Sequence, residues 1–452
     1  MKKIKVVGAG LAGAEAAWQI ARLGLGCELL DIKPGQMTAA HSSIYPAELV
    51  CSNSLKSDDP QTASGLLKRE MRQLDSIIMS AADATRVPAG SALAVDREAF
   101  ARRVDALLDS TGLIRRREQE IADLDVAADC LMILATGPLT TDKLMAAMAR
   151  EWGDMLYFFD AAAPIVSADS LDPEHYFFAS RYGKGSADYL NCPLDRDLYL
   201  KFRAALLAAD KVPVRDFDRK VFQDCQPLEI LAERGEDTMR FGPLKPVGLI
   251  DPRTGEVPYA VLQLRREQSS GEMYNLVGCQ TRLTFSAQRE VFGLIPALRE
   301  AEYLRFGVMH RNHYIHGPKV LAVGNKVRSR ENLFLAGQIT GVEGYLESAA
   351  SGLITARLVA LVAAGLPVDC LSSLTLPPTT MMGALANYVT TSDSKDFQPM
   401  NANFGILCYD PDFVTARRKR ERREQVMPMS DHHLAIWRDK YLKLCQDYGL
   451  CS

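Results

Sequence analysis

Three glycines near the start of the sequence have the spacing of a phosphate-binding turn. Gly8, Gly10 and Gly13 follow a short β-branched run, residues 3–7, and precede a helical stretch, residues 14–23. In such a turn the first glycine makes a tight bend, the second lets the backbone approach a pyrophosphate, and the third lets helix pack on strand. The helix N-terminus then offers free N–H groups to the phosphates. The predicted dinucleotide-binding residues are Gly8, Ala9, Gly10, Leu11, Ala12 and Gly13.

An acidic residue and two later turns extend this prediction. Asp31 ends a second predicted strand, residues 27–31, where an acid can accept hydrogen bonds from a ribose. A third strand, residues 130–134, runs into Ala-Thr-Gly, and a fourth, residues 332–335, runs into Ala-Gly. A nicotinamide dehydrogenase needs only the first fingerprint, whereas two-domain FAD proteins use such later turns near the flavin, so the pattern favours FAD. The predicted cofactor residues in this part of the chain are Thr136, Gly137, Gly337, Gln338, Gly344 and Tyr345.

The elements that must position these residues predict an α/β fold. Apolar strands that run into glycine-containing turns indicate a parallel, Rossmann-type sheet of the glutathione-reductase-like kind, with its ligand at the carboxyl edge. Beyond about residue 150 the chain changes to short strands and turns, such as residues 259–264 and 274–277, which predicts an inserted α+β domain. The expected division is the first part of the FAD-binding domain in 1–150, the insertion in 151–320, the second part of the FAD-binding domain in 321–370, and a C-terminal segment with a basic tail in 371–452.

The cysteines and the hydropathy of the sequence indicate which cellular compartment to expect. The ten cysteines are scattered and no two are spaced C-x-x-C, which excludes a zinc ribbon or a thioredoxin-type motif. Nothing resembles the framework of a small secreted domain, so reduced thiols in a cytoplasm are expected. No uncharged apolar run reaches the roughly 18 residues of a membrane span, because the best stretch contains Arg357.

Charge is unevenly distributed along the chain. The formal net charge is −3, so a polyanionic partner would need a local basic patch. From residue 416 onward there are 9 basic and 5 acidic residues, a net charge of +4, which leaves −7 for residues 1–415. Residues 417–423 alone hold six cations in seven positions. A solvated helix face and a tail that binds RNA phosphates both account for this run.

Eight sequence blocks, spread over about residues 4–405, match a known family. The blocks are residues 6–18, 47–55, 87–97, 186–193, 241–249, 307–312, 341–350 and 397–403. On these blocks the chain resembles the folate- and FAD-dependent tRNA (uracil-5-)-methyltransferases, the TrmFO family, which are relatives of the GidA/MnmG flavoproteins. The resemblance implies a GidA-related FAD-binding fold.

The resemblance also implies a reaction and two functional cysteines. 5,10-Methylenetetrahydrofolate would supply the carbon and FAD, reduced by NADPH or NADH, the electrons, to form 5-methyluridine at position 54 of the tRNA T-loop. Uracil carbon 5 is a poor nucleophile, and a thiolate that adds to carbon 6 turns the ring into a reactive enolate. By position Cys225 is assigned to this addition. Cys51, beside the flavin, would remove the carbon 5 proton or protect the intermediate.

Substrate-binding residues follow from the same blocks. His310 is expected to stack on the flat pterin of folate, and Arg97, Lys245 and Arg311 to meet the folate glutamate tail or RNA phosphates. Further candidate cations outside the matching blocks are Arg265, Arg266 and Arg282. The H-x-x-H-x-x-H run of residues 310–316 is expected to be extended. Its middle histidine would then point away from the other two, so no metal site is predicted.

Two alternatives to a tRNA-modifying enzyme stay open. A related enzyme could perform the same reaction on a ribosomal RNA uridine. A non-catalytic flavoprotein could bind RNA as a chaperone or sensor. The presence of both Cys51 and Cys225 in the expected positions argues against the second alternative, because binding alone needs neither thiol.

Overall fold

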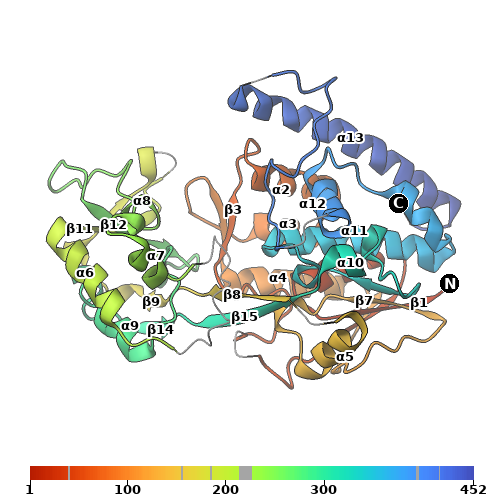
Figure 1. The fold of residues 1–452 in the computed structure, drawn as a ribbon, viewed down its shortest axis with the longest axis horizontal. Coiled ribbons are helices and arrows are strands. Elements are labelled where there is room, and N and C mark those ends of the chain that lie inside the picture. The colour runs from red at the N-terminus through yellow and green to blue at the C-terminus, as the bar shows by residue number, and fades with distance from the viewer. Residues whose placement is uncertain are drawn as a thin grey trace.

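The fold consists of two bodies joined by a two-stranded ribbon (Figure 1). The computed structural model describes residues 1–38, 41–153, 156–183, 186–212, 226–392, 397–416 and 418–451. Strands β8 (Leu156–Ala161) and β15 (Met309–Tyr314) pair antiparallel and form the ribbon. Residues on either side of the ribbon form two large, separate hydrophobic cores.

The first body is built on a five-stranded parallel sheet in the order β16-β7-β1-β2-β6. β7 (Cys130–Leu134) is buried along its whole length, as expected for a parallel strand covered on both faces. β1 (Lys3–Val7) and β2 (Cys27–Asp31) have the predicted bounds, and β16 is Leu333–Leu335. The predicted α/β fold with a parallel Rossmann-type sheet is confirmed. β6 (Ile114–Glu118) was not predicted, because this edge strand carries charge at four of its five positions.

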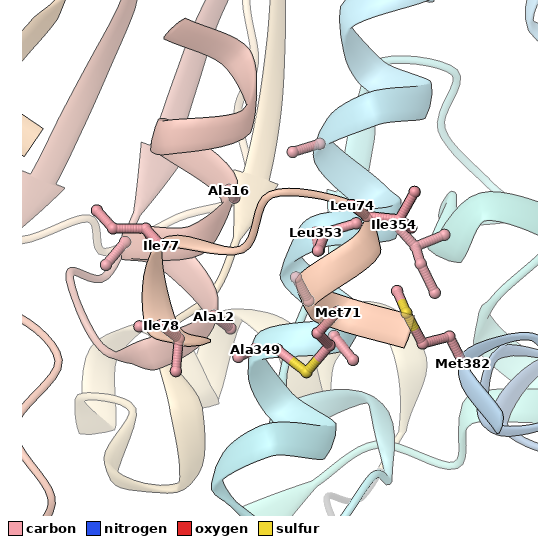
Figure 2. Packing of buried hydrophobic residues seen from close by; sticks show 14 of the residues in the cluster. Ala12, Ala16, Met71, Leu74, Ile77, Ile78, Ala349, Leu353, Ile354 and Met382 are labelled. Carbon is pink, nitrogen blue, oxygen red and sulfur yellow. The ribbon is translucent and has the colours of Figure 1, made fainter. Parts of the chain in front are cut away.

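Two helices of small residues cross closely over this sheet. α1 (Leu11–Arg22) and α11 (Tyr345–Ala364) approach so tightly that a Cβ on Gly352 would lie 2.2 Å from the Ala12 carbonyl oxygen. Figure 2 shows Ala12 and Ala349 within this contact. Among the described helices, α11 is the only one long and apolar enough to span a membrane, and its most apolar stretch is entirely buried in the protein. It is a core helix that brings its N-terminal residues to the edge of the sheet.

The remaining elements of the first body cover the sheet and extend it with a C-terminal layer. A small antiparallel sheet in the order β3-β5-β4 stands beside the main sheet. The C-terminal helix lies across α2 and closes the first core with the stacked, buried rings of Trp437 and Tyr441. The bounds are β3 (Ser54–Ser57), β4 (Arg86–Val87), β5 (Ala92–Val95), α2 (Ala63–Gln73), α3 (Ile77–Ala84), α4 (Arg97–Ser110), α5 (Asp142–Trp152), α10 (Gly317–Val320), α12 (Met381–Thr391) and α13 (Lys419–Asp447).

The second body is a six-stranded antiparallel sheet in the order β10-β11-β12-β13-β9-β14, with its own helices. Its core packs Phe202 against Phe292 and includes the fully buried ring of Tyr199. The bounds are β9 (Ile165–Ser167), β10 (Phe177–Ala179), β11 (Tyr189–Leu194), β12 (Ala260–Arg266), β13 (Met273–Leu276), β14 (Tyr303–Arg305), α6 (Arg196–Ala208), α7 (Leu228–Arg234), α8 (Thr238–Phe241) and α9 (Phe285–Phe292). We refer to this body as the inserted domain.

Candidate active site

The glycine turn between β1 and α1 leaves space in front of the helix. Gly8 has a φ of +96°, and a Cβ on Gly13 would lie 1.7 Å from the Gly8 carbonyl oxygen, so both positions require glycine. A Cβ on Gly10, by contrast, would meet no atom within 4 Å. Gly10 is also the N-cap of α1, and no side chain caps this helix end. The free N–H groups of the first turn therefore face an open space, as a pyrophosphate requires.

Asp31 lies beside this turn at the end of β2. Its carboxylate accepts hydrogen bonds from the backbone N–H of Ala9, at 2.5 Å, and from that of Lys33, at 2.8 Å. Each carboxylate oxygen keeps a further lone pair for a ligand hydroxyl. The acid thus fixes the glycine turn and remains available to a ribose.

A first cavity of about 1120 Å³ runs along the carboxyl ends of the parallel strands. Its length extends from Asp31 and Glu120 to Gly337 and Tyr345. The predicted cofactor residues in its wall are Gly8, Gly10, Leu11, Ala12, Asp31, Thr136, Gly137, Gly337, Gln338 and Tyr345. The size, the uncapped helix and the acid fit a dinucleotide such as FAD. Among the other predicted cofactor residues, Ala9 contributes its N–H to Asp31, Gly13 permits the close helix contact, and Gly344 lies in a second cavity.

The second cavity, of about 1390 Å³, lies between the first body and the inserted domain. Its first wall includes Cys51, Lys56 and Glu347, and its second wall comes from the inserted domain and includes Arg265 and Asn275. The two cavities share the wall residues Val50, Pro138, Leu139, Gln338 and Tyr345. A cofactor in the first cavity can therefore reach a substrate in the second.

Cys51 is half-buried at this junction, in a loop that is held from both bodies. The hydroxyl oxygen of Tyr345 accepts the backbone N–H groups of Cys51, at 2.6 Å, and Ser52, at 3.2 Å. Burial raises the pKa of Tyr345 well above its usual value, so the ring stays a neutral hydroxyl. From the inserted domain, Arg265 donates to the Ser52 hydroxyl at 2.8 Å and to the Asn53 side-chain oxygen at 2.9 Å.

Two guanidinium groups give this junction a positive field. Burial alone would lower the pKa of Arg97, but the Glu267 carboxylate, 2.9 Å away, outweighs it and raises the pKa. Burial and the nearby Arg97 lower the pKa of Arg305, while Cys51 and Glu48 act in the opposite direction. Both cations are close enough to Cys51 to interact with it electrostatically. Positive charge beside a thiol stabilises the thiolate.

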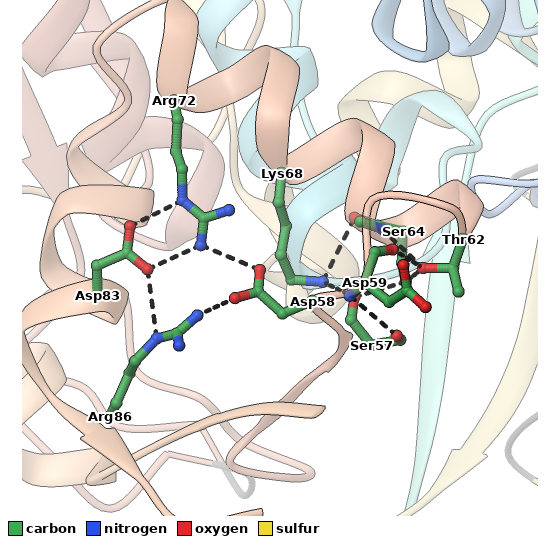
Figure 3. Close-up of polar contacts among 10 residues, drawn as sticks. Ser57, Asp58, Asp59, Thr62, Ser64, Lys68, Arg72, Asp83 and Arg86 are labelled. Carbon is green, nitrogen blue, oxygen red and sulfur yellow. Dashed lines mark hydrogen bonds and ion pairs between the residues drawn. The ribbon is translucent and has the colours of Figure 1, made fainter. Parts of the chain in front are cut away.

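The second cavity is also lined by a lysine–carboxylate pair. Lys56 Nζ lies 3.5 Å from the buried Glu347 carboxylate, which also accepts the backbone N–H of Ala402. Near this pair Lys68 is fully buried and donates to the carbonyl oxygens of Ser57 and Ser64 (Figure 3). Burial lowers the pKa of Lys68 to about 7. Within the described residues, no cluster of histidine, cysteine and acidic side chains could hold a metal ion.

The structure does not bring every predicted substrate residue to the cavities. Lys245 is exposed and lines neither cavity. Arg97 also lines neither cavity, because its guanidinium group binds the Glu267 carboxylate and the Leu49 carbonyl oxygen. His310 and Arg311 lie on β15, where only the backbone is described. Cys225 lies outside the described residues.

Sequence reasoning missed several polar residues of the first cavity. Lys33 donates to the carbonyl oxygens of Ser43 and Tyr45, and burial lowers its pKa. Glu48 accepts three hydrogen bonds from Ser42 and Ser43. The available signal was positional, because these residues follow the strand that ends in Asp31, where α/β folds place ligand-binding loops.

Comparison with known proteins defines the class first. Residues 3–367 match the family of glucose inhibited division protein A, GIDA. Two solved structures of Aquifex aeolicus GidA, in crystal forms II and I, superpose with TM-scores of 0.67 and 0.63 at 15% sequence identity. They cover 99% of this chain, which covers 76% and 78% of theirs. The fold is therefore that of the GidA-type proteins.

Closer relatives then define the family. The methylenetetrahydrofolate–tRNA-(uracil-5-)-methyltransferase TrmFO of Moorella thermoacetica is 49% identical over 440 residues, 96% of this chain and 97% of that protein. The TrmFO proteins of Desulforudis audaxviator and Geobacter sulfurreducens are 50% and 49% identical, again over 96% of this chain, and over 97% and 99% of their own lengths. The chain belongs to the TrmFO family.

Proposed function

We propose that the protein methylates carbon 5 of uridine 54 in the tRNA T-loop. The carbon comes from 5,10-methylenetetrahydrofolate, and the reductant is FAD that NADPH or NADH keeps reduced. The observation that carries this proposal is the junction of the two cavities at Cys51 and Tyr345 in a chain that aligns with TrmFO proteins over 96% of its length. A dinucleotide cavity that opens onto a thiol matches a flavin-dependent transfer to an activated pyrimidine.

The two cysteines assigned from the sequence and the residues around Cys51 have complementary duties in this reaction. The Cys225 thiolate adds to uracil carbon 6, which makes carbon 5 nucleophilic toward the methylene group. Cys51 takes the proton from carbon 5, and Arg97 and Arg305 stabilise its thiolate. Tyr345 and Arg265 hold the Cys51 loop in place. When bound, reduced FAD supplies the two electrons that turn the transferred methylene into a methyl group.

The target base must leave the folded T-loop to reach this thiol. Extrusion costs a few kcal/mol of unstacking and unpairing, which contacts to the RNA have to offset. The cleft between the two bodies offers the pocket. The exposed arginines at the start of α13, Arg418, Arg420 and Arg423, offer phosphate contacts. Such an RNA partner and nine described free cysteines suit a cytoplasmic location.

The decisive test combines a spectrum with two RNA assays. We expect the purified protein to be yellow, with flavin absorbance near about 370 and 450 nm. We expect it to incorporate folate-derived methyl groups into unmodified tRNA, and we expect the Cys51→Ala variant to lose this activity while it stays yellow. Incorporation into ribosomal RNA alone would establish the alternative substrate. A yellow protein that methylates neither RNA would be a non-catalytic flavoprotein.

A further inference from the structure

A row of buried polar side chains crosses the sheet of the inserted domain on the face toward Cys51. Asn191 of β11 pairs across the strands with Gln263 of β12, and Arg265 of β12 pairs with Asn275 of β13. Residues directly opposite in an antiparallel pair point to the same face, as do residues two apart on one strand. Arg265 reaches the Ser52 hydroxyl on this face, so the row is directed at the Cys51 loop.

All members of this row except Asn275 have protein partners for their side-chain nitrogens. Asn191 donates to three backbone carbonyl oxygens, and Gln263 donates to the side-chain oxygen of Asn191 at 2.8 Å. Arg265 is bound to the Cys51 loop. Asn275 is only 3% exposed, and its Nδ2 has no hydrogen-bond partner among the described residues.

An unpaired buried amide donor destabilises a folded protein, so such a donor is typical of a site that binds a ligand. Asn275 lines the second cavity opposite Cys51 and Tyr345. A ligand that offers a carbonyl oxygen there would pair the free donor. The carboxamide also has an acceptor oxygen beside its donor nitrogen, so it matches a ligand with a carbonyl next to a ring N–H.

We propose that Asn275 recognises the cyclic amide edge, a carbonyl beside a ring N–H, of the heterocycle that is brought to Cys51. This proposal rests on the proposed function. Two substrates of that reaction carry such an edge, namely the uracil ring through its O4 and N3–H, and the pterin ring of folate through the same pair of groups. The polar row of the inserted domain thereby recognises the heterocycle, and the Cys51 loop carries the thiol that reacts with it.

The test measures binding to the purified flavin-loaded protein for Asn275→Ala and for the similarly sized Asn275→Leu. The probes are unmodified tRNA, followed by filter binding, and tetrahydrofolate, followed by quenching of protein fluorescence. We expect an approximately tenfold weaker Kd for one of the two ligands. A loss for tRNA alone assigns the uracil edge, and a loss for tetrahydrofolate alone assigns the pterin edge.

Stability separates recognition from a structural role. Because Asn275 Nδ2 has no partner in the described protein, neither substitution should lower the melting temperature. Asn387→Ala, at an exposed position of α12, serves as the matched control and should change neither Kd. Unchanged binding of both ligands, or a lower melting temperature with unchanged binding, would overturn the proposal. Methyl transfer by the wild-type protein in the same preparation reports separately on the proposed function.

Discussion

The hydroxyl of Tyr345 connects the cofactor cavity to the thiol beside it. In Tyr345→Phe the backbone N–H groups of Cys51 and Ser52 lose their acceptor, and the loop keeps only its contacts to the other residues, such as Arg265. Small displacements of a reacting group are costly in rate. We expect kcat for tRNA methylation to fall at least about tenfold, while the flavin content stays unchanged. Single-turnover kinetics and the visible spectrum of the same sample measure both quantities.

A matched tyrosine controls for the loss of a hydroxyl in general. Tyr388 donates to the carbonyl oxygen of Gln398 and lines neither cavity. Tyr388→Phe should therefore leave kcat unchanged. An equal loss of rate in both variants would contradict a specific role for Tyr345.

Sequence reasoning reached some of these residues and not others, for a physical reason. Gly8, Gly10 and Gly13 lie in one local turn, so their spacing in the sequence predicts a dinucleotide site without knowledge of the rest of the fold. Tyr345 was expected to touch the cofactor, but its bond to the Cys51 loop joins residues 294 positions apart. The free donor of Asn275 is evident only when the strand register is known. Contacts of this kind depend on the completed fold.

A buried carboxylate joins three helices of the first body. Glu70 of α2 accepts the backbone N–H groups of Met381 and Met382 at the start of α12, and the hydroxyl of Ser430 in α13. Burial raises the pKa of Glu70 from 4.5 to about 7, although these hydrogen bonds act in the opposite direction. Between these two values the folded protein keeps a proton that the unfolded chain has lost.

The free energy of unfolding should therefore fall as the pH rises through this window. For Glu70 alone the expected decrease between about pH 5.5 and 8.5 is about 2 kcal/mol. Glu70→Gln removes the titrating group, so the wild-type protein should lose this amount relative to the variant over the same range. Urea denaturation of both proteins at several pH values measures the difference and cancels the other titrating groups. Parallel pH profiles of the two proteins would contradict the assignment.

A second element-scale link joins α4 to the inserted domain. Arg97 at the start of α4 pairs with Glu267, which follows β12 and has a side chain only 2% exposed. Arg97→Met leaves this carboxylate buried without its cation, and we expect a destabilisation of about 3–5 kcal/mol. The double variant Arg97→Met with Glu267→Met should recover most of that loss, because no charge is left unpaired. Urea denaturation of the single and double variants provides the measurement, and purely additive effects would contradict the link.

Element prediction succeeded where pattern and burial agree. The strands β1, β2 and β7 were predicted with their observed bounds, and β7 has the fully apolar sequence of a strand that is covered on both faces. β6 shares the same sheet but lies at its edge, and its Arg-rich sequence resembles a surface segment. Its place depends on pairing with β2, which local composition does not encode.

The small net charge of the protein conceals a separation of charge along the chain. The chain carries −3 in total, but the segment from residue 416 onward carries +4. Four of its described arginines, Arg418, Arg420, Arg422 and Arg423, stand at the N-terminal end of α13, where the helix dipole disfavours cations. In Figure 1 this end of α13 is the one on the side of the inserted domain. A bound polyanion would compensate the cations for this unfavourable position, which supports a role of the segment in RNA binding.

Salt dependence tests this role, because each phosphate contact releases a counterion. Arg418 and Arg420 have side chains 86% and 92% exposed, so Arg418→Gln with Arg420→Gln should leave the fold intact. We expect the slope of log Kd for tRNA against log salt to decrease by about two. The control pair, Arg103→Gln with Arg115→Gln, removes two exposed cations from α4 and β6 and should leave the slope unchanged. If α13 contacts the phosphates directly, only the α13 pair should lower the slope. Equal decreases for the two pairs would show that α13 contributes only to the overall charge of the protein, because a long-range electrostatic effect does not depend on which cations are removed.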